Sequence, residues 1–403
     1  METNLAVAPD ARPELAAGDG AQAAAHLRAS GIVALTVAHC AGMVDLVALP
    51  VWVGTLIGAY RFDPQQAGLL VTLFLAGAVG GSLVFSPRLN RLPARAMAAL
   101  GFGVAALAFA GIVSRGDYRT MAALHAVAGI AVGCGLSFTH GTIGRSRRPL
   151  RLFAGAGLAL GVFGIAFLGA TPAWIGRYGG PTLFRVFAVV MAVGAIACAL
   201  AFPSLRARQA AAPANEPRFA RAVWFGMVGV GCIGLTQSML FSFVQRIGLD
   251  RGFDFAAVTG TLIALGVVNL FPASLAALLE RRVAGRTVVR IGPVVQAALA
   301  IVITQSTTFA PYAAATAVFA AVMIFTHTFA FGMLARIDRT GRAVAATPAM
   351  LMTGAAVGPL LGGTLVKLAG YGSLGGAALV MAAAAVFCLS RLDRHPNPQG
   401  DTA

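Results

Sequence analysis

Apolar residues in this chain occur in long runs, separated by short segments that hold most of the charged residues. A helix needs about 20 apolar residues to cross a bilayer, and runs of that length predict membrane-spanning helices. We expect twelve of them, at residues 31–59, 67–86, 96–114, 120–143, 152–175, 182–203, 222–245, 255–278, 287–306, 311–335, 345–366 and 373–390. The pattern therefore predicts an all-α membrane protein.

The polar segments between the runs differ in charge. One set of alternate loops is rich in arginine, as at 88–95, 145–151 and 281–286, and the other set holds fewer basic residues. Basic residues collect on the cytoplasmic side of membrane proteins, and an even number of spans leaves both chain ends on one side. We therefore expect both termini in the cytoplasm and the chain in the inner (cytoplasmic) membrane of a bacterium.

Composition supports this class of protein. The chain is 58% hydrophobic and 11% charged, whereas a soluble domain carries about 25% charged residues. Its solvent must be the lipid bilayer. The net charge of +16 could also suit nucleic acid, but the arginines lie in short loops between spans, so we expect no nucleic-acid partner. We expect a monomer.

Chemistry-bearing motifs are scarce. Five cysteines stand singly inside apolar runs without metal-ligand spacing, which favours small buried hydrophobes over a metal site. The sequence contains no HExxH, no GxSxG and no phosphate-binding loop. We expect neither a metal nor catalytic residues, so the pattern does not favour an enzyme.

The longest internal polar segment, residues 204–221, follows the sixth expected span. It divides the chain into an N-terminal tail (1–29), a six-helix bundle (30–203), a cytoplasmic linker (204–221), a second six-helix bundle (222–391) and a C-terminal tail (392–403). The two bundles carry related strings at matching positions. "SPRLNRLPAR" follows the second span and "LLERRVAGR" follows the eighth, while Asp63 and Asp254 each stand where they can cap the next helix.

Together these features resemble the major facilitator superfamily, in its bacterial form. The family's signature after the second helix reads approximately G-x-L-a-D-R-x-G-R-R, and both strings resemble it with departures. The resemblance implies two pseudo-symmetric six-helix bundles that work by alternating access, and it implies a cytoplasmic gate at Asn90, Arg91, Arg95, Glu280, Arg281 and Arg286. Asn90 stands where the family has an acid, which removes charge from the first half of that gate. The alternative is that these arginines only set the topology.

A glycine-rich string, "GAAVGPLLGG", lies in the eleventh span. It resembles a motif that the family's antiporters carry in their fifth helix. Repeated small residues let helix backbones approach closely, and a proline kinks the helix. Close packing between the halves explains the string better than a role in export does. The residues are Gly354, Gly358, Pro359, Gly362 and Gly363.

Asp45 is the only acidic residue inside an expected span. A charged aspartate at the centre of a helix costs on the order of 3 kcal/mol on insertion scales, so it faces the protein interior or a watery cavity. In the resembled family the first helix lines the substrate path. Asp45 is therefore expected to carry a coupling proton, to bind a cationic substrate group, or to alternate between the two. The structural alternative is a static pair with a basic residue such as Arg185.

Other polar residues at depth are few. Overlaying the halves by their capping aspartates sets Asp45 beside Thr236 and Gln237, which makes Gln237 a candidate for hydrogen bonding to substrate. His327 in the tenth span and His140 in the fourth are further cavity candidates, although either can simply bond a neighbouring helix. Asn269 and Gln296 suit interhelical hydrogen bonds.

The family resemblance implies secondary transport of a small organic molecule with no cofactor but the proton gradient. Few polar residues, and no mid-depth Arg or Lys, favour proton-coupled export of an apolar or cationic drug or metabolite by antiport. Proton-coupled uptake of a nutrient or metabolite is the alternative. A transporter-derived receptor or scaffold is the alternative of another class.

Overall fold

A computed structural model describes residues 27–203, 221–337 and 347–392. Most of the two expected tails and of the linker therefore lies outside the described residues. Within them the chain is helical without strands, and twelve helical segments are long and apolar enough to cross a membrane. The all-α prediction is confirmed, and every expected span has its counterpart.

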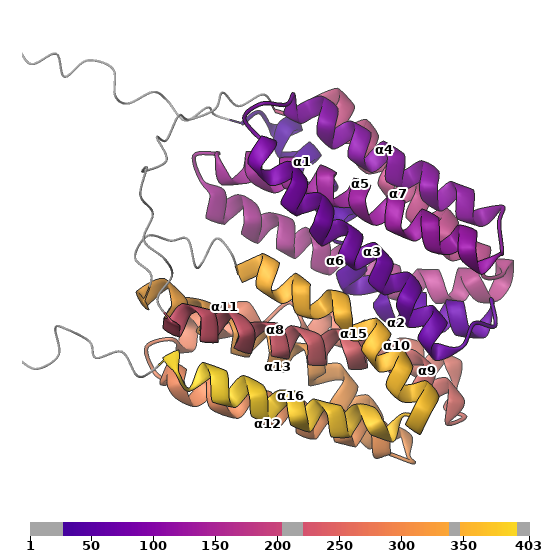
Figure 1. The fold of residues 1–403 in the computed structure, drawn as a ribbon, viewed down its shortest axis with the longest axis vertical. Helices are drawn as coiled ribbons and strands as arrows, with labels where there is room; N and C mark the ends of the chain where they lie inside the picture. Colours follow the sequence, from indigo (N-terminus) through magenta and orange to yellow (C-terminus); the bar gives the residue numbers. More distant parts are fainter. Residues whose placement is uncertain (1–26, 204–220, 338–346, 393–403) are drawn as a thin grey trace, which may run out of the picture.

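The first six spans are built from eight helical elements, shown from indigo to magenta in Figure 1. They are α1 (Ala29–Gly42), α2 (Asp45–Gly58), α3 (Pro64–Phe85), the short 3-10 helix η1 (Ser86–Arg88), α4 (Ala94–Val113), α5 (Tyr118–Gly144), α6 (Pro149–Tyr178) and α7 (Pro181–Ala201).

The last six spans are likewise built from eight elements, shown from red to yellow. They are α8 (Arg221–Phe241), α9 (Val244–Asp250), α10 (Phe255–Val268), α11 (Pro272–Leu279), α12 (Gly285–Gln305), α13 (Phe309–Ile337), α15 (Thr347–Ala369) and α16 (Gly372–Leu389).

Three of the spans are interrupted, which hydropathy did not predict. Span 1 breaks between α1 and α2, span 7 between α8 and α9, and span 8 between α10 and α11. The third break has a covalent cause, because Pro272 has no N–H to bond to the carbonyl of Val268. At the first break, shorter i→i+3 bonds replace helical ones, as from the Leu46 amide to the Met43 carbonyl at 3.2 Å.

The expected caps are confirmed. The Asp63 carboxylate accepts from the Gln66 amide at 2.8 Å, and the Gln66 side chain accepts from the Asp63 amide, which makes a complete capping box. Asp254 likewise accepts from the Ala257 amide at 2.9 Å. The two caps stand at equivalent loops of the two halves and support the repeat inferred from sequence.

Glycines set the packing inside the N-terminal half. Gly77 and Gly81 of α3 face α5, and Gly129 and Gly133 of α5 face α3. A Cβ at any of the four would come within 3 Å of the facing backbone. The two helices therefore cross in backbone contact, as small residues permit in membranes.

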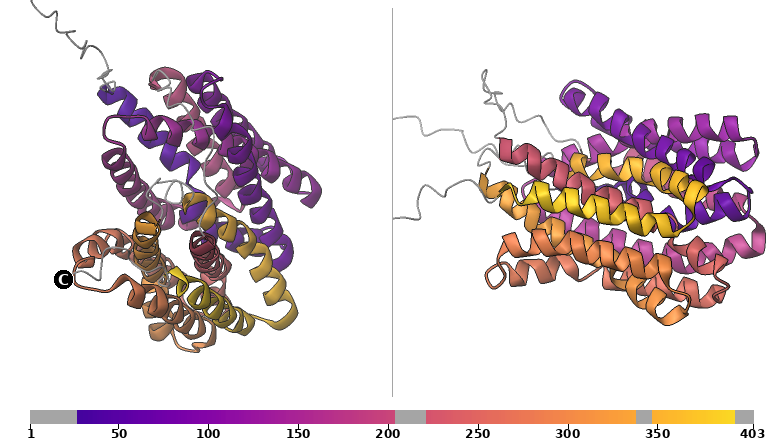
Figure 2. Two further views of the ribbon diagram at one scale, coloured as in Figure 1. Left: turned by 60° about the vertical axis from the view of Figure 1, so that its left-hand side comes forward. Right: turned by 60° about the horizontal axis from the view of Figure 1, so that its bottom comes forward.

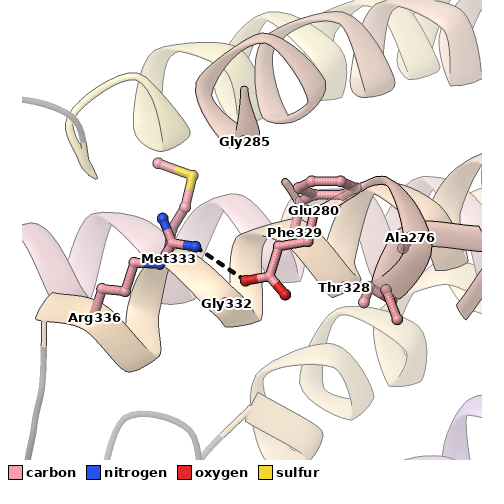
Figure 3. Close-up of a pocket in the computed structure, with 9 residues that line it drawn as sticks. Ala276, Glu280, Gly285, Thr328, Phe329, Gly332, Met333 and Arg336 are labelled. Carbon is pink, nitrogen blue, oxygen red and sulfur yellow. Dashed lines mark hydrogen bonds and ion pairs between the residues drawn. The ribbon is translucent and has the colours of Figure 1, made fainter. Parts of the chain in front are cut away.

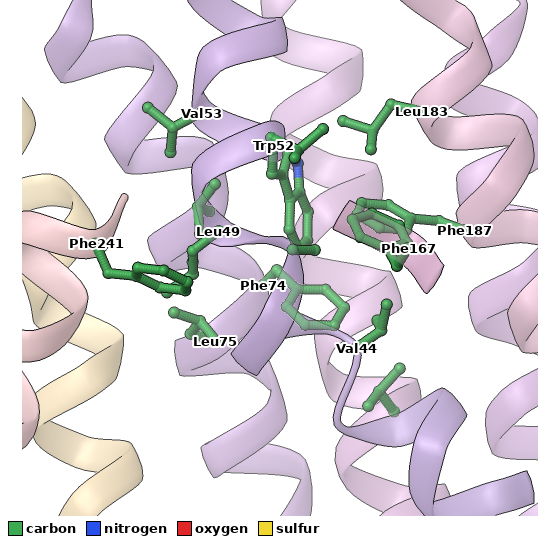
Figure 4. Packing of buried hydrophobic residues seen from close by; sticks show 14 of the residues in the cluster. Val44, Leu49, Trp52, Val53, Phe74, Leu75, Phe167, Leu183, Phe187 and Phe241 are labelled. Atoms are coloured by element: carbon green, nitrogen blue, oxygen red, sulfur yellow. The ribbon is translucent and has the colours of Figure 1, made fainter. Parts of the chain in front are cut away.

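The largest buried cluster fills the N-terminal half and continues into the C-terminal half. Trp52 of α2 is fully buried in it, with ring centroids 4.7 Å from Phe187 and 5.1 Å from Phe74. Figure 4 shows Phe241 of the C-terminal half close to Leu49. The two halves thus share apolar packing at mid-depth.

We call the end of the bundle that carries loops 86–93, 145–148 and 280–284 the arginine-rich end, and the other the opposite end. The halves meet through α3 with α15, α6 with α10, and α2 with α8 and α9 (Figures 1 and 2). Between described residues, every hydrogen bond and ion pair that joins the halves lies on α3 and α15 or the loop before α3, toward the opposite end. The structure is therefore closed at the opposite end.

Candidate functional site

Asp45 is the first residue of α2, directly after the break in span 1. Asp45 is buried, with 3% of its surface exposed. Its carboxylate interacts with its own backbone amide and with that of Leu46. The start of a helix carries a partial positive charge, which stabilises a carboxylate. The break thus supplies the local polar environment that a membrane-buried acid needs.

The pairing of Asp45 with Arg185 is not observed. No ion pair joins Asp45 to any described basic residue. Arg185 is exposed near the opposite end, where its charge acts on Tyr60. Burial raises the pKa of the Tyr60 phenol to about 12, and the charge of Arg185 opposes that shift. Asp45 therefore lacks the static partner that would have explained it.

Two histidines in the N-terminal half form a pair that the sequence did not predict. Nδ1 of His39 in α1 lies 3.0 Å from Nε2 of His140 in α5, and the ring of His140 packs on Phe153 of α6 at 5.5 Å between centroids. His140, a cavity candidate, is thus tied to another ionisable ring. Two neutral imidazoles bond in this way when one donates and the other accepts.

His125 has no motif around it in the sequence, yet it holds a central place in the buried cluster. It is fully buried, its Nδ1 donates to the Met121 carbonyl at 2.7 Å, and its Nε2 accepts from the Trp52 indole at 3.3 Å. Both nitrogens have partners that fix a neutral ring. His125 is therefore a structural histidine that orients Trp52.

In the C-terminal half, Gln237 and Gln296 bond to each other. The Gln296 amide donates to the Gln237 side-chain oxygen at 3.2 Å, joining α8 to α12, as suits an interhelical bond. Thr236, also buried, donates to its own helix at the Cys232 carbonyl. Asn269 differs from the expectation: its side-chain oxygen is buried with no hydrogen-bond partner among the described residues.

His327 of α13 is half-buried. Its Nδ1 lies 3.0 Å from the Met323 sulfur, and its ring packs on Phe331 with centroids 4.9 Å apart. No described residue hydrogen-bonds to Nε2, so one ring nitrogen is available to a ligand or water.

The gate candidates lie at the arginine-rich end, and the side-chain bonds that Asn90, Arg95 and Glu280 make stay within their own halves. Asn90 accepts from Arg145 at 3.0 Å, and Arg95 donates to the Leu200 carbonyl at 2.6 Å, near the end of α7. Arg91 is exposed. Arg145, which the signature does not include, is thus the residue that holds Asn90.

The second half repeats this arrangement with charges. Glu280 pairs with Arg336 at 3.0 Å, as Figure 3 shows, beside a pocket of about 160 Å³. Arg281 and Arg286 are exposed. Asn90 follows span 2 and Glu280 follows span 8, which are equivalent in the two halves. Their partners Arg145 and Arg336 lie at the ends of the equivalent helices α5 and α13, so Arg336 corresponds to Arg145.

The glycine string of α15 has two packing faces. Gly354, Gly358 and Gly362 press on α8 of the same half rather than on the other half. Gly363 faces the backbone of Pro64 across the halves, and the Pro359 carbonyl faces Gly68 of α3. Contact between the halves is thus made by the second face only.

Polar contacts flank this crossing at the opposite end. Lys367 donates to Asp63 at 3.0 Å and to the Gln65 oxygen at 3.2 Å, while Gln65 donates to Thr364 at 3.3 Å. Although partial burial acts to raise the pKa of Asp63, the Gln66 amide and the Lys367 ammonium outweigh it and hold that pKa below its usual value.

Twelve spans in two repeated bundles, with their polar contacts to each other toward one end, are the architecture of secondary transporters. The family model described as Major Facilitator Superfamily matches residues 34–337, and the chain belongs to that superfamily. It is a membrane transporter rather than an enzyme. No curated protein sequence matches the chain.

Solved structures share the fold. The nucleoside transporter NupG superposes with a TM-score of 0.67 at 13% identity, covering 90% of this chain and 98% of NupG, and a substituted form of it superposes with 0.69. An inward-facing, occupied bacterial homologue of the human lysosomal transporter Spinster gives 0.63 at 14% identity, covering 90% of this chain and 92% of the homologue.

Proposed function

We propose that this transporter couples the export of a small organic molecule to proton entry, and that Asp45 carries the proton. The observation that carries the proposal is a buried carboxylate in a membrane span with no basic partner among the described residues. Such a group is a functional candidate by default. Its place at a helix break lets a small backbone movement change its surroundings.

The orientation follows from the charge bias. If the arginine-rich end faces the cytoplasm, as positive-inside counting requires, the structure is closed toward the outside of a bacterial inner membrane. In the outward-open state the contacts between α3 and α15 would part. The pairs Asn90–Arg145 and Glu280–Arg336 would then stand where the two halves approach.

The substrate class follows from the polar groups that remain available. His327 offers one ring nitrogen and Gln237 offers its side-chain NH2 group. A neutral imidazole and an amide are both uncharged. No Arg or Lys stands at mid-depth in the described spans to bind an anion. A largely apolar or cationic drug or metabolite suits these groups best.

The test is proton flux in liposomes that contain the purified protein and an internal pH-sensitive dye. Under an imposed pH gradient, wild type and Asp45→Asn are compared over a panel of cationic, neutral and anionic compounds. Asparagine keeps a helix-start acceptor but cannot carry a proton, so it separates coupling from capping. Asp254→Asn, a surface cap substituted in the same way, is the matched control.

Compound-dependent proton flux that Asp45→Asn abolishes and Asp254→Asn retains supports the proposal. Flux that survives in Asp45→Asn removes Asp45 from the coupling step.

Uptake is the second candidate, since one similar fold is that of a nucleoside transporter. Nucleosides therefore belong in the panel, and the sign of the flux with the gradient reversed decides the direction.

A further inference from the structure

The C-terminal half carries an apolar groove of about 520 Å³ that shares no lining residue with the pocket beside Glu280 and Arg336. It lies between α11 and α12, with α13 as its floor. Both α11 and α12 pack on α13, but they make almost no contact with each other. Apart from Thr287 and Thr326 the lining is apolar, and the Thr326 hydroxyl donates to the Val322 carbonyl.

The groove faces the lipid. Its rim includes side chains that are strongly exposed although apolar, with Phe271 62%, Leu275 48% and Ile291 54% exposed. All three belong to membrane spans. A molecule in the groove would therefore contact both the protein and the bilayer.

The corresponding crossing in the N-terminal half is tighter. There α3 and α5 meet in backbone contact through Gly77, Gly81, Gly129 and Gly133. In the C-terminal half, span 8 breaks at Asn269–Phe271 and no matching glycines draw it onto α13 within the described residues. The close crossing of α3 and α5 therefore has no counterpart between span 8 and α13 within the described residues.

Length and charge indicate the occupant. From Thr287 to Val295 the groove follows α12 for about 12 Å at 1.5 Å per residue, which is most of one leaflet of a core about 30 Å thick. Exposed Arg281, Arg282 and Arg286 stand at its arginine-rich end. Basic residues beside a membrane attract anionic head groups.

We propose that this groove binds one acyl chain of an anionic phospholipid, from the leaflet at the arginine-rich end, with the head group at Arg282 and Arg286. The inference does not depend on which compound is transported or in which direction.

The experiment uses the full-length protein in nanodiscs that contain phosphatidylglycerol with a photoreactive acyl chain, and mass spectrometry of the labelled peptides. Ala321→Trp fills the groove from α13, and Ala110→Trp, on the lipid face of α4 in the other half, is the matched control. Val295→Trp fills the groove from α12 if Ala321→Trp does not fold. The double variant Arg282→Gln/Arg286→Gln tests the head-group site. Its control is Arg151→Gln, which removes another exposed arginine at the same end.

We expect wild type and Ala110→Trp to concentrate the label on residues 283–295 and 318–326. The variants that fill the groove should lower the labelling of these residues to the level of the other lipid-facing helices. The double arginine variant should lose the preference for phosphatidylglycerol over photoreactive phosphatidylcholine, and Arg151→Gln should keep it. Label spread evenly over lipid-facing helices, label unchanged by filling, or equal labelling by the two lipids in wild type would each overturn the proposal.

Discussion

At the scale of the residue, ionisable side chains in the membrane are distinguished by their partners. His125 has both ring nitrogens bonded, His39 and His140 bond to each other, and Asp45 has only backbone amides. Burial alone does not separate these cases. A group whose partners fix one protonation state is structural, whereas a group without a charged partner can exchange a proton.

The Trp52–His125 bond predicts a stability effect. His125→Phe leaves the buried Trp52 N–H without a partner, so we expect a loss of about 1–3 kcal/mol of stability, measured as a lower midpoint of thermal unfolding. Adding Trp52→Phe removes the orphaned donor and should recover part of the loss. A double variant less stable than the sum of the two single variants would contradict this account.

The Asp63–Lys367 pair predicts a pH dependence. Because the pKa of folded Asp63 lies below its ordinary value of about 3.9, the pair is complete above that value and is lost as the pH falls through the lower folded pKa. The assay places a cysteine at the opposite end and measures its labelling by a water-soluble thiol reagent. Asp63→Asn should raise the labelling of this cysteine over wild type, and the factor should be the same from pH 8 to about pH 5.

Below about pH 4 the wild type should approach Asp63→Asn in this assay. Asp117→Asn is the control, since Asp117 also caps a helix and asparagine can replace its acceptor oxygen. A wild type that converges with Asp63→Asn already near pH 6 would mean that another group controls the closure.

At the scale of the element, glycines decide how closely helices pack, and the same residue type has opposite effects at different positions. Gly129 faces the backbone of Phe74, whereas a Cβ added to Gly157 of α6 would meet no neighbouring atom within 4 Å. Helix propensity favours alanine over glycine by about 1 kcal/mol at both sites. Only at the first does the added methyl group collide with a neighbouring helix.

We therefore expect Gly129→Ala to lower stability by about 1–3 kcal/mol through overpacking, and Gly157→Ala to leave it unchanged or raised. Thermal unfolding of the purified variants in one detergent checks both. Equal effects from the two substitutions would show that the α3–α5 crossing is loose enough to accept a methyl group.

At the scale of the whole molecule, the hydrogen bonds and the ion pair that join the halves between described residues lie toward one end, on α3 and α15 or the loop before α3. Transport by alternating access requires these contacts to part in every cycle. Gln65 and Thr364 touch across them at 3.3 Å. A covalent link at this point should hold the observed conformation.

Gln65→Cys/Thr364→Cys, treated with a short bifunctional thiol reagent, should lose substrate flux in liposomes. The single variants treated alike should keep it, which controls for the five native cysteines. Unimpaired flux in the fully cross-linked double variant would show that transport does not need the opposite end to open.

The sequence by itself determined the class of fold. Twelve long apolar runs leave no alternative to twelve helices, because unpaired backbone groups are not tolerated in lipid. It also determined the caps at Asp63 and Asp254, which depend on neighbours three residues away, and it drew attention to Asp45 through the insertion cost of one acid.

Only the tertiary structure decided what depends on distant residues. It set Asn90 against Arg145, Glu280 against Arg336 and His39 against His140, and it left Asp45 without Arg185. It also broke spans 1 and 7 and opened the groove beside α13. Hydropathy measures only whether a segment prefers lipid to water, so partners brought together by helix packing lie beyond what it can specify.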